Sequence, residues 1–191
     1  MASVEASRSD ETRTRLLQAA ERILIAQGVH ALTVRRVGAV SGLNGTLVTY
    51  HFGGIVGLLT ELAQRNLAPM VADWAGLPAA GESPDTVLGA WLRPLLRPAA
   101  FNPEGRALIV LDEIAAHGSA ELRDEVMAAM VATSLTPHLP QLGAHTLRAR
   151  LRFSAGAALG PPPRLPAPGG SLGDLASFDQ LLAFARAALG D

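Results

Sequence analysis

The spacing of apolar residues constrains the fold more than any other feature of this sequence. In "RLLQAAERILIA" (residues 15–26), Leu, Ile and Ala recur every three to four positions, as on the buried face of an α-helix. Similar patterns, separated by Gly and Pro, continue toward the end of the chain, and strand-like alternation persists nowhere. The spacing predicts an all-α protein of about nine helices, with three near the N-terminus and a bundle of longer helices after them.

Capping residues and glycines predict where the three N-terminal helices begin and end. A side chain that can accept from free backbone N–H groups precedes each helix, and a Gly follows each of the first two. The predicted starts are Ser9 or Asp10, Thr33 and Asn44, and the predicted ends are Gly28 and Gly42.

The later helices are expected from the same periodicity and punctuation. A fourth helix, at residues 53–76, contains Pro69, which predicts a kink. "GPPPRLPAPGGSLG" is rich in Pro and Gly and is expected to be a loop at residues 160–173. The other expected helices lie near residues 84–97, 103–117, 119–139, 143–159 and 174–189.

Composition excludes several classes of function. Hydrophobic residues make up 49% of the chain and the net charge is −1, so overall charge gives no reason to expect an acidic partner. Residues 1–52 nevertheless hold six Arg and four acidic residues, which permits an anionic partner at that end. The chain has no Cys, which excludes disulfides, thiolate catalysis and zinc sites built on Cys. Neither a signal peptide nor a membrane-spanning run is visible, so we expect a soluble, cytoplasmic protein without membrane contact.

Catalysis is not expected. The sequence has no Gly-rich phosphate loop, no nucleophile elbow and no convincing acid–base pair. Asp112, Glu113 and His117 have a spacing that can hold a metal on a helix face, but surface pairing explains them equally well. We therefore predict no enzyme activity, no cofactor and no metal.

The segment "GLNGTLVTYHF" (residues 42–52) follows a short helix through a Gly-containing turn, which is the pattern of a helix-turn-helix motif. Val48 and Phe52 lie four residues apart and would pack inward. Thr46, Thr49 and Tyr50 share a neighbouring face, where short uncharged side chains let a helix approach base edges. The alternative is an αα-hairpin inside a helical core.

Residues 12–67 resemble the N-terminal domain of the TetR family of transcriptional regulators. "TVR" (residues 33–35) opens the second helix and "SGL" (residues 41–43) forms the turn. "YHF" (residues 50–52) closes the recognition helix, and "GLL" (residues 57–59) follows in the fourth helix. The resemblance implies a dimeric regulator with a DNA-binding head and a helical sensor.

The resemblance implies two domains: a helix-turn-helix DNA-binding domain at residues 1–54, and a ligand-binding and dimerisation domain at residues 55–191. Family members often have a cation at the positions of Gly45 and Ile55, which predicts fewer phosphate contacts here. Arg8, Arg13 and Arg15 would either compensate or form a solvated helix face. The expected DNA-contacting residues are Thr33, Arg35, Asn44, Gly45, Thr46, Thr49, Tyr50 and His51.

Large apolar side chains on the middle helices are candidates for an effector site, although such residues are more often plain core. They predict an apolar or amphipathic effector. The candidates are Met70, Trp74, Trp91, Leu95, Phe101, Ile109, Met127 and Met130. The last two helices are rich in Ala and Gly and are expected to form a homodimer surface, with an intramolecular core as the alternative. The apolar residues expected there are Leu147, Leu151, Phe153, Leu159, Phe178, Leu181, Leu182 and Phe184.

Together these features predict a ligand-responsive dimeric repressor that binds a palindromic operator on double-stranded DNA and is released by a small-molecule effector. The alternative is a TetR-fold module that binds a small molecule or a protein and has weakened or lost DNA binding.

Overall fold

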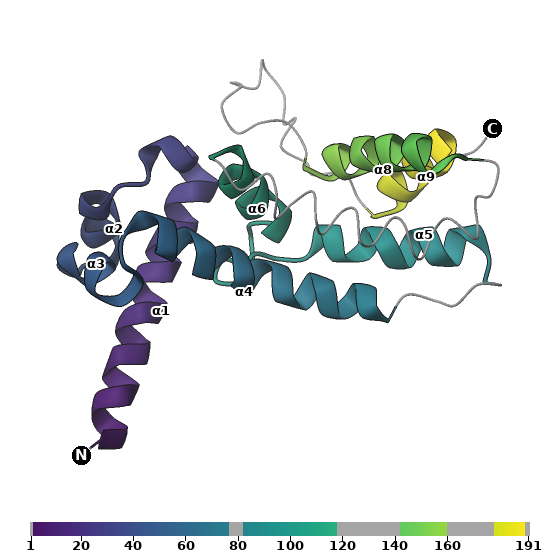
Figure 1. Cartoon of the computed structure of the whole chain (residues 1–191). Coiled ribbons are helices and arrows are strands. Elements are labelled where there is room, and N and C mark those ends of the chain that lie inside the picture. The colour runs from purple at the N-terminus through teal and green to yellow at the C-terminus, as the bar shows by residue number, and fades with distance from the viewer. Residues whose placement is uncertain (1, 77–81, 118–141, 160–177, 190–191) are drawn as a thin grey trace.

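The computed structural model describes residues 2–76, 82–117, 142–159 and 178–189, and this part of the chain is helical (Figure 1). An isolated antiparallel bridge between Pro98 and Arg106 is the one β feature in the described ranges. The predicted all-α class is confirmed. The helices are α1 (Ala2–Gln27), the 3₁₀ turn η1 (Val29–Ala31), α2 (Val34–Ser41), α3 (Thr46–Phe52), α4 (Ile55–Ala75), α5 (Pro84–Leu92), the 3₁₀ turn η2 (Arg93–Leu96), α6 (Ala107–Ala116), α8 (Ala144–Leu159) and α9 (Phe178–Leu189).

Two predicted helix starts are wrong. α1 begins at Ala2, so Ser9 and Asp10 lie inside it, because the Ala, Glu and Arg residues before them favour helix and nothing interrupts it. α6 begins at Ala107, not near residue 103, because the preceding residues form a loop in which the Ala107 N–H donates to the Arg97 carbonyl at 3.0 Å. The predicted helix at 119–139 and loop at 160–173 lie outside the described residues.

α1, α2 and α3 gather at one end with the start of α4, while α8 and α9 pair at the other end (Figure 1). α4 runs from the first group toward the second, and the N-terminal half of α1 projects beyond the other helices. Pro69 is accommodated inside α4. No helix in the described ranges combines the length and the apolar character needed to cross a membrane.

The buried side chains form two clusters. The head cluster comprises Leu16, Leu17, Ala19, Ala20, Ile23, Leu24, Val29, Leu32, Val37, Val48, Leu58, Leu59, Leu62, Ala63, Ala99, Val110 and Ile114. The bundle cluster comprises Met70, Trp74, Val87, Leu88, Trp91, Leu92, Leu95, Ala107, Leu108, Leu147, Leu151, Ala155, Leu181 and Ala185. α4 and α6 contribute to both clusters. They therefore connect the part of the molecule around the head cluster, called the head, to the part around the bundle cluster, called the bundle.

A surface ion pair fastens α4 to the end of η2. The Arg97 guanidinium donates to both carboxylate oxygens of Asp73, at 2.6 and 3.0 Å. These hydrogen bonds with Arg97 hold the pKa of Asp73 below its ordinary value, against a smaller opposing effect of desolvation. A lowered folded-state pKa means that the stabilisation is present above the ordinary pKa and is lost as pH falls through the lowered value.

We therefore expect the melting temperature of Asp73→Asn to fall less than that of the wild type as the pH is lowered into the acid range. The effect should be small and should shrink in high salt, because both partners are largely exposed to solvent. The melting temperature of both proteins, followed from neutral pH into acid at two salt concentrations, checks this. Parallel curves for the two proteins would contradict it.

Candidate DNA-binding surface

Local capping begins and ends α2 as predicted. The Oγ1 of Thr33 accepts the Arg36 N–H at 3.1 Å, so Thr33 is the N-cap. Gly42 ends the helix in the left-handed conformation, with a φ of 68°, and its N–H donates to the Gly38 carbonyl. A glycine adopts this conformation without the strain that a Cβ would bring.

The start of α3 is closed by Asn44. Its Oδ1 accepts the Thr46 N–H at 3.0 Å, and its carbonyl accepts the Leu47 N–H at 3.0 Å. The side-chain oxygen of Asn44 is therefore used within the turn, as predicted, although α3 itself begins one residue later, directly after Gly45.

Two glycines bring α2 and α3 into backbone contact. A Cβ placed on Gly45 would lie 2.8 Å from the carbonyl oxygen of Val34, and one on Gly38 would lie 2.7 Å from the backbone nitrogen of Gly45. Neither distance is compatible with a side chain unless the helices move apart. Gly45 is thus explained by helix packing, and the position has no room for the cation that relatives often carry.

α3 presents a polar, uncharged face on a buried anchor. Val48 is fully buried in the head cluster, whereas Thr46, Thr49 and Tyr50 are exposed. The Tyr50 side chain is 81% exposed and lies edge-to-face with the half-buried His51, at 4.9 Å between ring centroids. The face therefore consists of two hydroxyl-bearing β-branched side chains and one aromatic ring.

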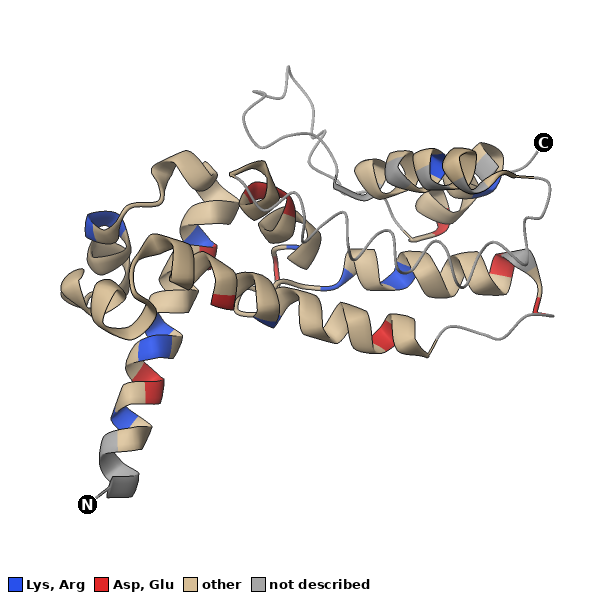
Figure 2. Ribbon diagram, in the orientation of Figure 1, with Lys and Arg blue, Asp and Glu red and all other residues tan. Residues whose placement is uncertain are grey.

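The cations of this end lie on α1 and α2, and α3 itself carries no Arg or Lys (Figure 2). Arg35 is exposed near the start of α2, beside Thr33. Its neighbour Arg36 donates to the Gln27 side chain at 2.9 Å, which ties α2 to the end of α1. Arg35 is therefore the cation best placed to accompany the polar face of α3.

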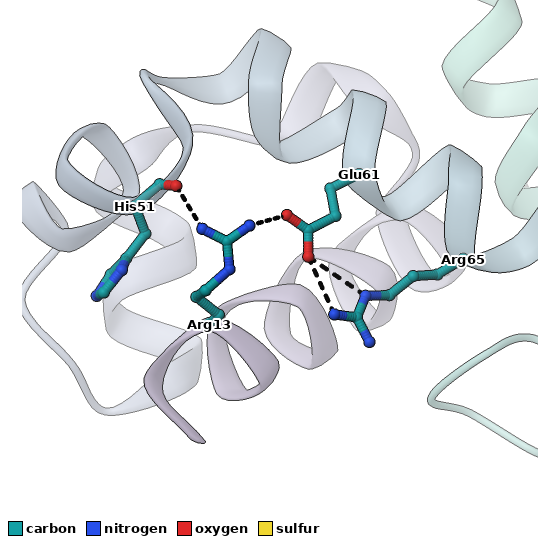
Figure 3. A network of polar contacts seen from close by, with 4 residues as sticks. All are labelled: Arg13, His51, Glu61 and Arg65. Carbon is teal, nitrogen blue, oxygen red and sulfur yellow. Dashed lines mark hydrogen bonds and ion pairs between the residues drawn. The ribbon is translucent and has the colours of Figure 1, made fainter. Parts of the chain in front are cut away.

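Arg13 is a structural tie between three helices (Figure 3). Its guanidinium on α1 donates to the His51 carbonyl on α3 at 2.7 Å and pairs with Glu61 on α4. It also lies 4.7 Å from the centroid of the Phe52 ring. Glu61 accepts a second bond from Arg65 at 3.1 Å. Arg13 is thus held in the head by an ion pair that it shares with Arg65.

Arg8, Arg13 and Arg15 were expected either to contact phosphates or to form a solvated helix face, and neither role fits all three. Arg15 donates to the Ser41 carbonyl at 2.9 Å, so it too holds α1 against α2. Arg8 and Arg15 are both exposed, so either could reach a phosphate, whereas Arg13 is half-buried and paired with Glu61. These ties cannot be predicted from local patterns, because His51 and Glu61 lie 38 and 48 residues from Arg13 along the chain.

The junction between α3 and α4 is built from glycines. Gly53 and Gly54 have φ values of 71° and 121°, which only glycine adopts readily. A Cβ on Gly57 would lie 1.9 Å from the Phe52 carbonyl oxygen, so the first turn of α4 sits directly on the end of α3. Ile55 is half-buried and packs against the head cluster, in place of the exposed cation expected at this position in relatives.

Phe52 is half-buried, not fully buried, and packs against the head cluster under the Arg13 guanidinium. We expect Phe52→Ala to lower the free energy of unfolding by about 1–3 kcal/mol, less than the roughly 3–5 kcal/mol of a fully buried Phe. Chemical denaturation checks the value. A loss no larger than that of a truncation at the exposed Tyr50 would show that the ring adds nothing to the core.

The candidate effector residues separate into three groups. Met70, Trp74, Trp91 and Leu95 are buried together in the bundle cluster. Phe101 packs instead against the head cluster, and Ile109 is half-buried on α6. Met127 and Met130 lie outside the described residues.

The two tryptophans of the bundle cluster differ in their hydrogen bonding. The Trp74 indole N–H donates to the Trp91 carbonyl at 3.0 Å. The Trp91 indole N–H is buried and has no acceptor in the described part of the chain. The apolar bundle therefore contains one polar donor whose hydrogen bond is not made within these residues.

One acidic residue near the end of α6, Glu113, faces the head. A carboxylate oxygen of Glu113 accepts the Val29 N–H at 2.7 Å. The His117 ring lies edge-to-face with His30, at 6.3 Å between centroids. Within the described residues no group of three or more His, Asp or Glu side chains is arranged to hold a metal ion.

α8 and α9 bury one side in the bundle cluster and expose the other. Leu147, Leu151 and Leu181 are buried. Phe153 is 70% exposed and Phe184 is 47% exposed. Each of the last two helices therefore has an uncovered aromatic side chain in the single chain.

Comparisons with known proteins agree with this geometry. Residues 16–62 match the family model for bacterial regulatory proteins of the tetR family. A solved structure described as a TetR-family transcriptional regulator from Rhodococcus sp. covers 94% of this chain and 97% of its own, with 19% identity and a TM-score of 0.57. A structure of the transcriptional regulatory protein RHA5900 covers 93% and 96%, with 19% identity and a TM-score of 0.61. No curated protein sequence matches the chain.

The class of protein follows from these matches: the chain has the fold of a TetR-family transcriptional regulator. Its residues 16–62 match the tetR-family model, so the resemblance predicted from the sequence is confirmed.

Proposed function

We propose that this protein is a ligand-responsive, dimeric transcriptional regulator that acts as a repressor. It binds a palindromic operator and is released by a small apolar or amphipathic molecule, without catalysing a reaction. Binding to operator DNA implies a cytoplasmic location. The observation that carries the proposal is the exposed face of Thr46, Thr49 and Tyr50 on α3, anchored by the buried Val48 within a TetR-type domain.

The chemistry of this face suits close contact with base edges in the major groove. Threonine methyl groups can touch the thymine methyl, and the hydroxyl groups can bond to bases or phosphates. Arg35 can reach a guanine or a phosphate from the adjoining helix. Because α3 carries no Arg or Lys and Arg13 is paired with Glu61, the interface has few cations for phosphates. We therefore expect a shallow dependence of affinity on salt.

Dimerisation would place two such heads on the two halves of a palindrome. The exposed Phe153 on α8 and Phe184 on α9 favour a symmetric interface through these two helices. Gly156 adds to this argument, because a Cβ built on it would meet no atom within 4 Å in the described part of the chain. Small residues of this kind allow helices of two subunits to approach closely.

The effector is expected to contact the bundle near Met70, Trp74, Trp91 and Leu95. The cluster that contains these residues is formed by apolar side chains. Burying a charge there would be costly, which favours an uncharged or amphipathic molecule. The Trp91 indole N–H could donate to one acceptor on it.

A second candidate function is a TetR-fold module that binds a small molecule or protein and no longer binds DNA. The packed Gly45 and the half-buried Ile55 favour it, because two positions that often carry phosphate-binding cations have none here. Selecting binding sites from a random duplex pool at low and moderate salt separates the two functions. Enrichment of a palindrome supports the regulator, whereas a folded dimer that enriches nothing at either salt supports the module.

The role of α3 can be tested at Tyr50. We expect Tyr50→Ala to weaken binding to the selected operator by about tenfold or more and to leave the melting temperature unchanged, because the side chain is exposed. Tyr50→Phe, which keeps the ring, separates the contribution of the hydroxyl group. Affinities measured by fluorescence anisotropy check both variants. Wild-type affinity in Tyr50→Ala would remove Tyr50 from the interface.

A further inference from the structure

The head and the bundle are joined by a buried polar pair that the proposed DNA and effector contacts do not use. Glu21 on α1 is 0% exposed and Asn66 on α4 is 2% exposed. The Asn66 side-chain amide donates to one carboxylate oxygen of Glu21 at 2.9 Å and to the Leu62 carbonyl at 3.1 Å. No arginine in the described residues pairs with Glu21.

The same pair holds the loop between η2 and α6. The Phe101 N–H donates to the second carboxylate oxygen of Glu21 at 2.7 Å, and the Ala100 N–H donates to the Asn66 side-chain carbonyl at 3.0 Å. Gly105 lies against α1 so closely that a Cβ on it would be 2.5 Å from the Ile25 side chain. Two side chains thus fix three segments: α1, α4 and the loop.

The pair lies where the two apolar clusters meet. Along α4, Leu62 and Ala63 belong to the head cluster and Met70 belongs to the bundle cluster, with Asn66 between them. Along the chain from η2, Leu95 belongs to the bundle cluster and Ala99 to the head cluster. Apolar contacts are non-directional, so they resist sliding at such a boundary weakly. Directional hydrogen bonds in a buried, fully paired network fix one arrangement.

We propose that Glu21 and Asn66 are positioning residues that set the angle between the head and the bundle, and thereby the distance between the two reading helices of the dimer. This inference rests on the proposed function, because half-site spacing has meaning only for a dimer that binds DNA. A loop that moves when the bundle changes would pull on Glu21 through Phe101. The pair therefore also gives the bundle a direct mechanical connection to α1.

Exchanging the donor and acceptor roles of the pair provides a sharp test. In Glu21→Gln, the new amide group must face either the Asn66 amide or the Phe101 N–H, so two donors oppose each other. In Asn66→Asp, two buried carboxylates face each other. In the double variant Glu21→Gln/Asn66→Asp, the amide at position 21 donates to the carboxylate at position 66, and both loop N–H groups keep acceptors. Only the bond from position 66 to the Leu62 carbonyl, which lies within α4, is lost. Glu104→Gln makes the same chemical change at an exposed side chain of this loop and is the control.

The readout is the affinity for the selected operator relative to the same half-sites moved one base pair apart or together. We expect each single variant to lower this ratio by about tenfold and to bind a duplex with one half-site as the wild type does. The double variant and Glu104→Gln should keep the wild-type ratio. If Glu21→Gln does not fold, Asn66→Ala is the milder substitute, since it leaves the bond between Glu21 and Phe101 in place.

Three results would overturn this inference and leave the proposed function standing. The single variants could melt at lower temperature with an unchanged ratio, which would make the pair merely structural. The single variants could lose as much affinity for a duplex with one half-site as for the full operator, which would show that the pair supports the DNA-contacting face of α3 itself. The double variant could fail to restore the ratio. A folded wild-type dimer that selects no operator would instead overturn the proposed function, and this is seen before any variant is made.

Discussion

Gly57→Ala should lower the free energy of unfolding by about 2–3 kcal/mol, because the added methyl group has no space. The Cβ would lie 1.9 Å from the Phe52 carbonyl oxygen, which is a backbone atom at the end of α3. No flexible side chain can move aside, so the start of α4 must shift away from α3. That shift would also displace the reading face, and we expect weaker operator binding even at temperatures where the variant is folded.

Gly89→Ala is the matched control for this prediction. Gly89 lies inside α5, and its Cβ would lie 3.5 Å from the ring of Phe178, which is an ordinary contact. Alanine is the better helix former there, so we expect a neutral result or a gain of about 0.5–1 kcal/mol. Urea denaturation of both variants gives the comparison. Equal stabilities would mean that the α3–α4 junction is more open than described here.

Phe153→Arg should raise the dimer dissociation constant by about a hundredfold or more while leaving the fold of the single chain intact. The side chain is 70% exposed in the isolated chain, so the substitution creates no buried charge there. In a dimer formed through α8 and α9, the same position would bury an arginine without an acidic partner, at a cost of about 3 kcal/mol or more. Operator affinity should fall with dimer concentration.

Val71→Arg is the control for the dimer prediction. Val71 is also an exposed apolar side chain, 46% exposed, but it lies on α4. Sedimentation velocity over a range of concentrations distinguishes the variants. A wild-type dissociation constant in Phe153→Arg, or an equal loss in Val71→Arg, would place the subunit contact elsewhere.

The parts of the fold that depend on neighbouring residues could be predicted from the sequence. Thr33, Asn44 and Gly42 were identified because a cap acts on backbone groups two to four residues away. The start of α6 was placed too early, because its position depends on a bond between residues 97 and 107 across a loop. Phe101 is predicted at the effector site, whereas the loop turns it toward the head cluster, for the same reason.

The ties that hold the candidate site together could not be predicted. Glu21 reads as one more polar position on an amphipathic helix, and its partners Asn66 and Phe101 are 45 and 80 residues away. Gly45 reads as a lost cation, whereas its close approach to Val34 makes it a packing residue. A pattern along one helix reports which side is buried, but not which buried polar groups meet.

The aromatic residues of this chain give each half of the molecule its own spectroscopic reporter. Both tryptophans lie in the bundle cluster, and the single tyrosine of the chain is on the exposed face of α3. Tryptophan emission would therefore follow unfolding or occupancy of the bundle alone, without any added dye. The ring resonances of Tyr50, which lies edge-to-face with His51, would follow the head. The unmodified protein can thus show whether its two halves melt together or one after the other.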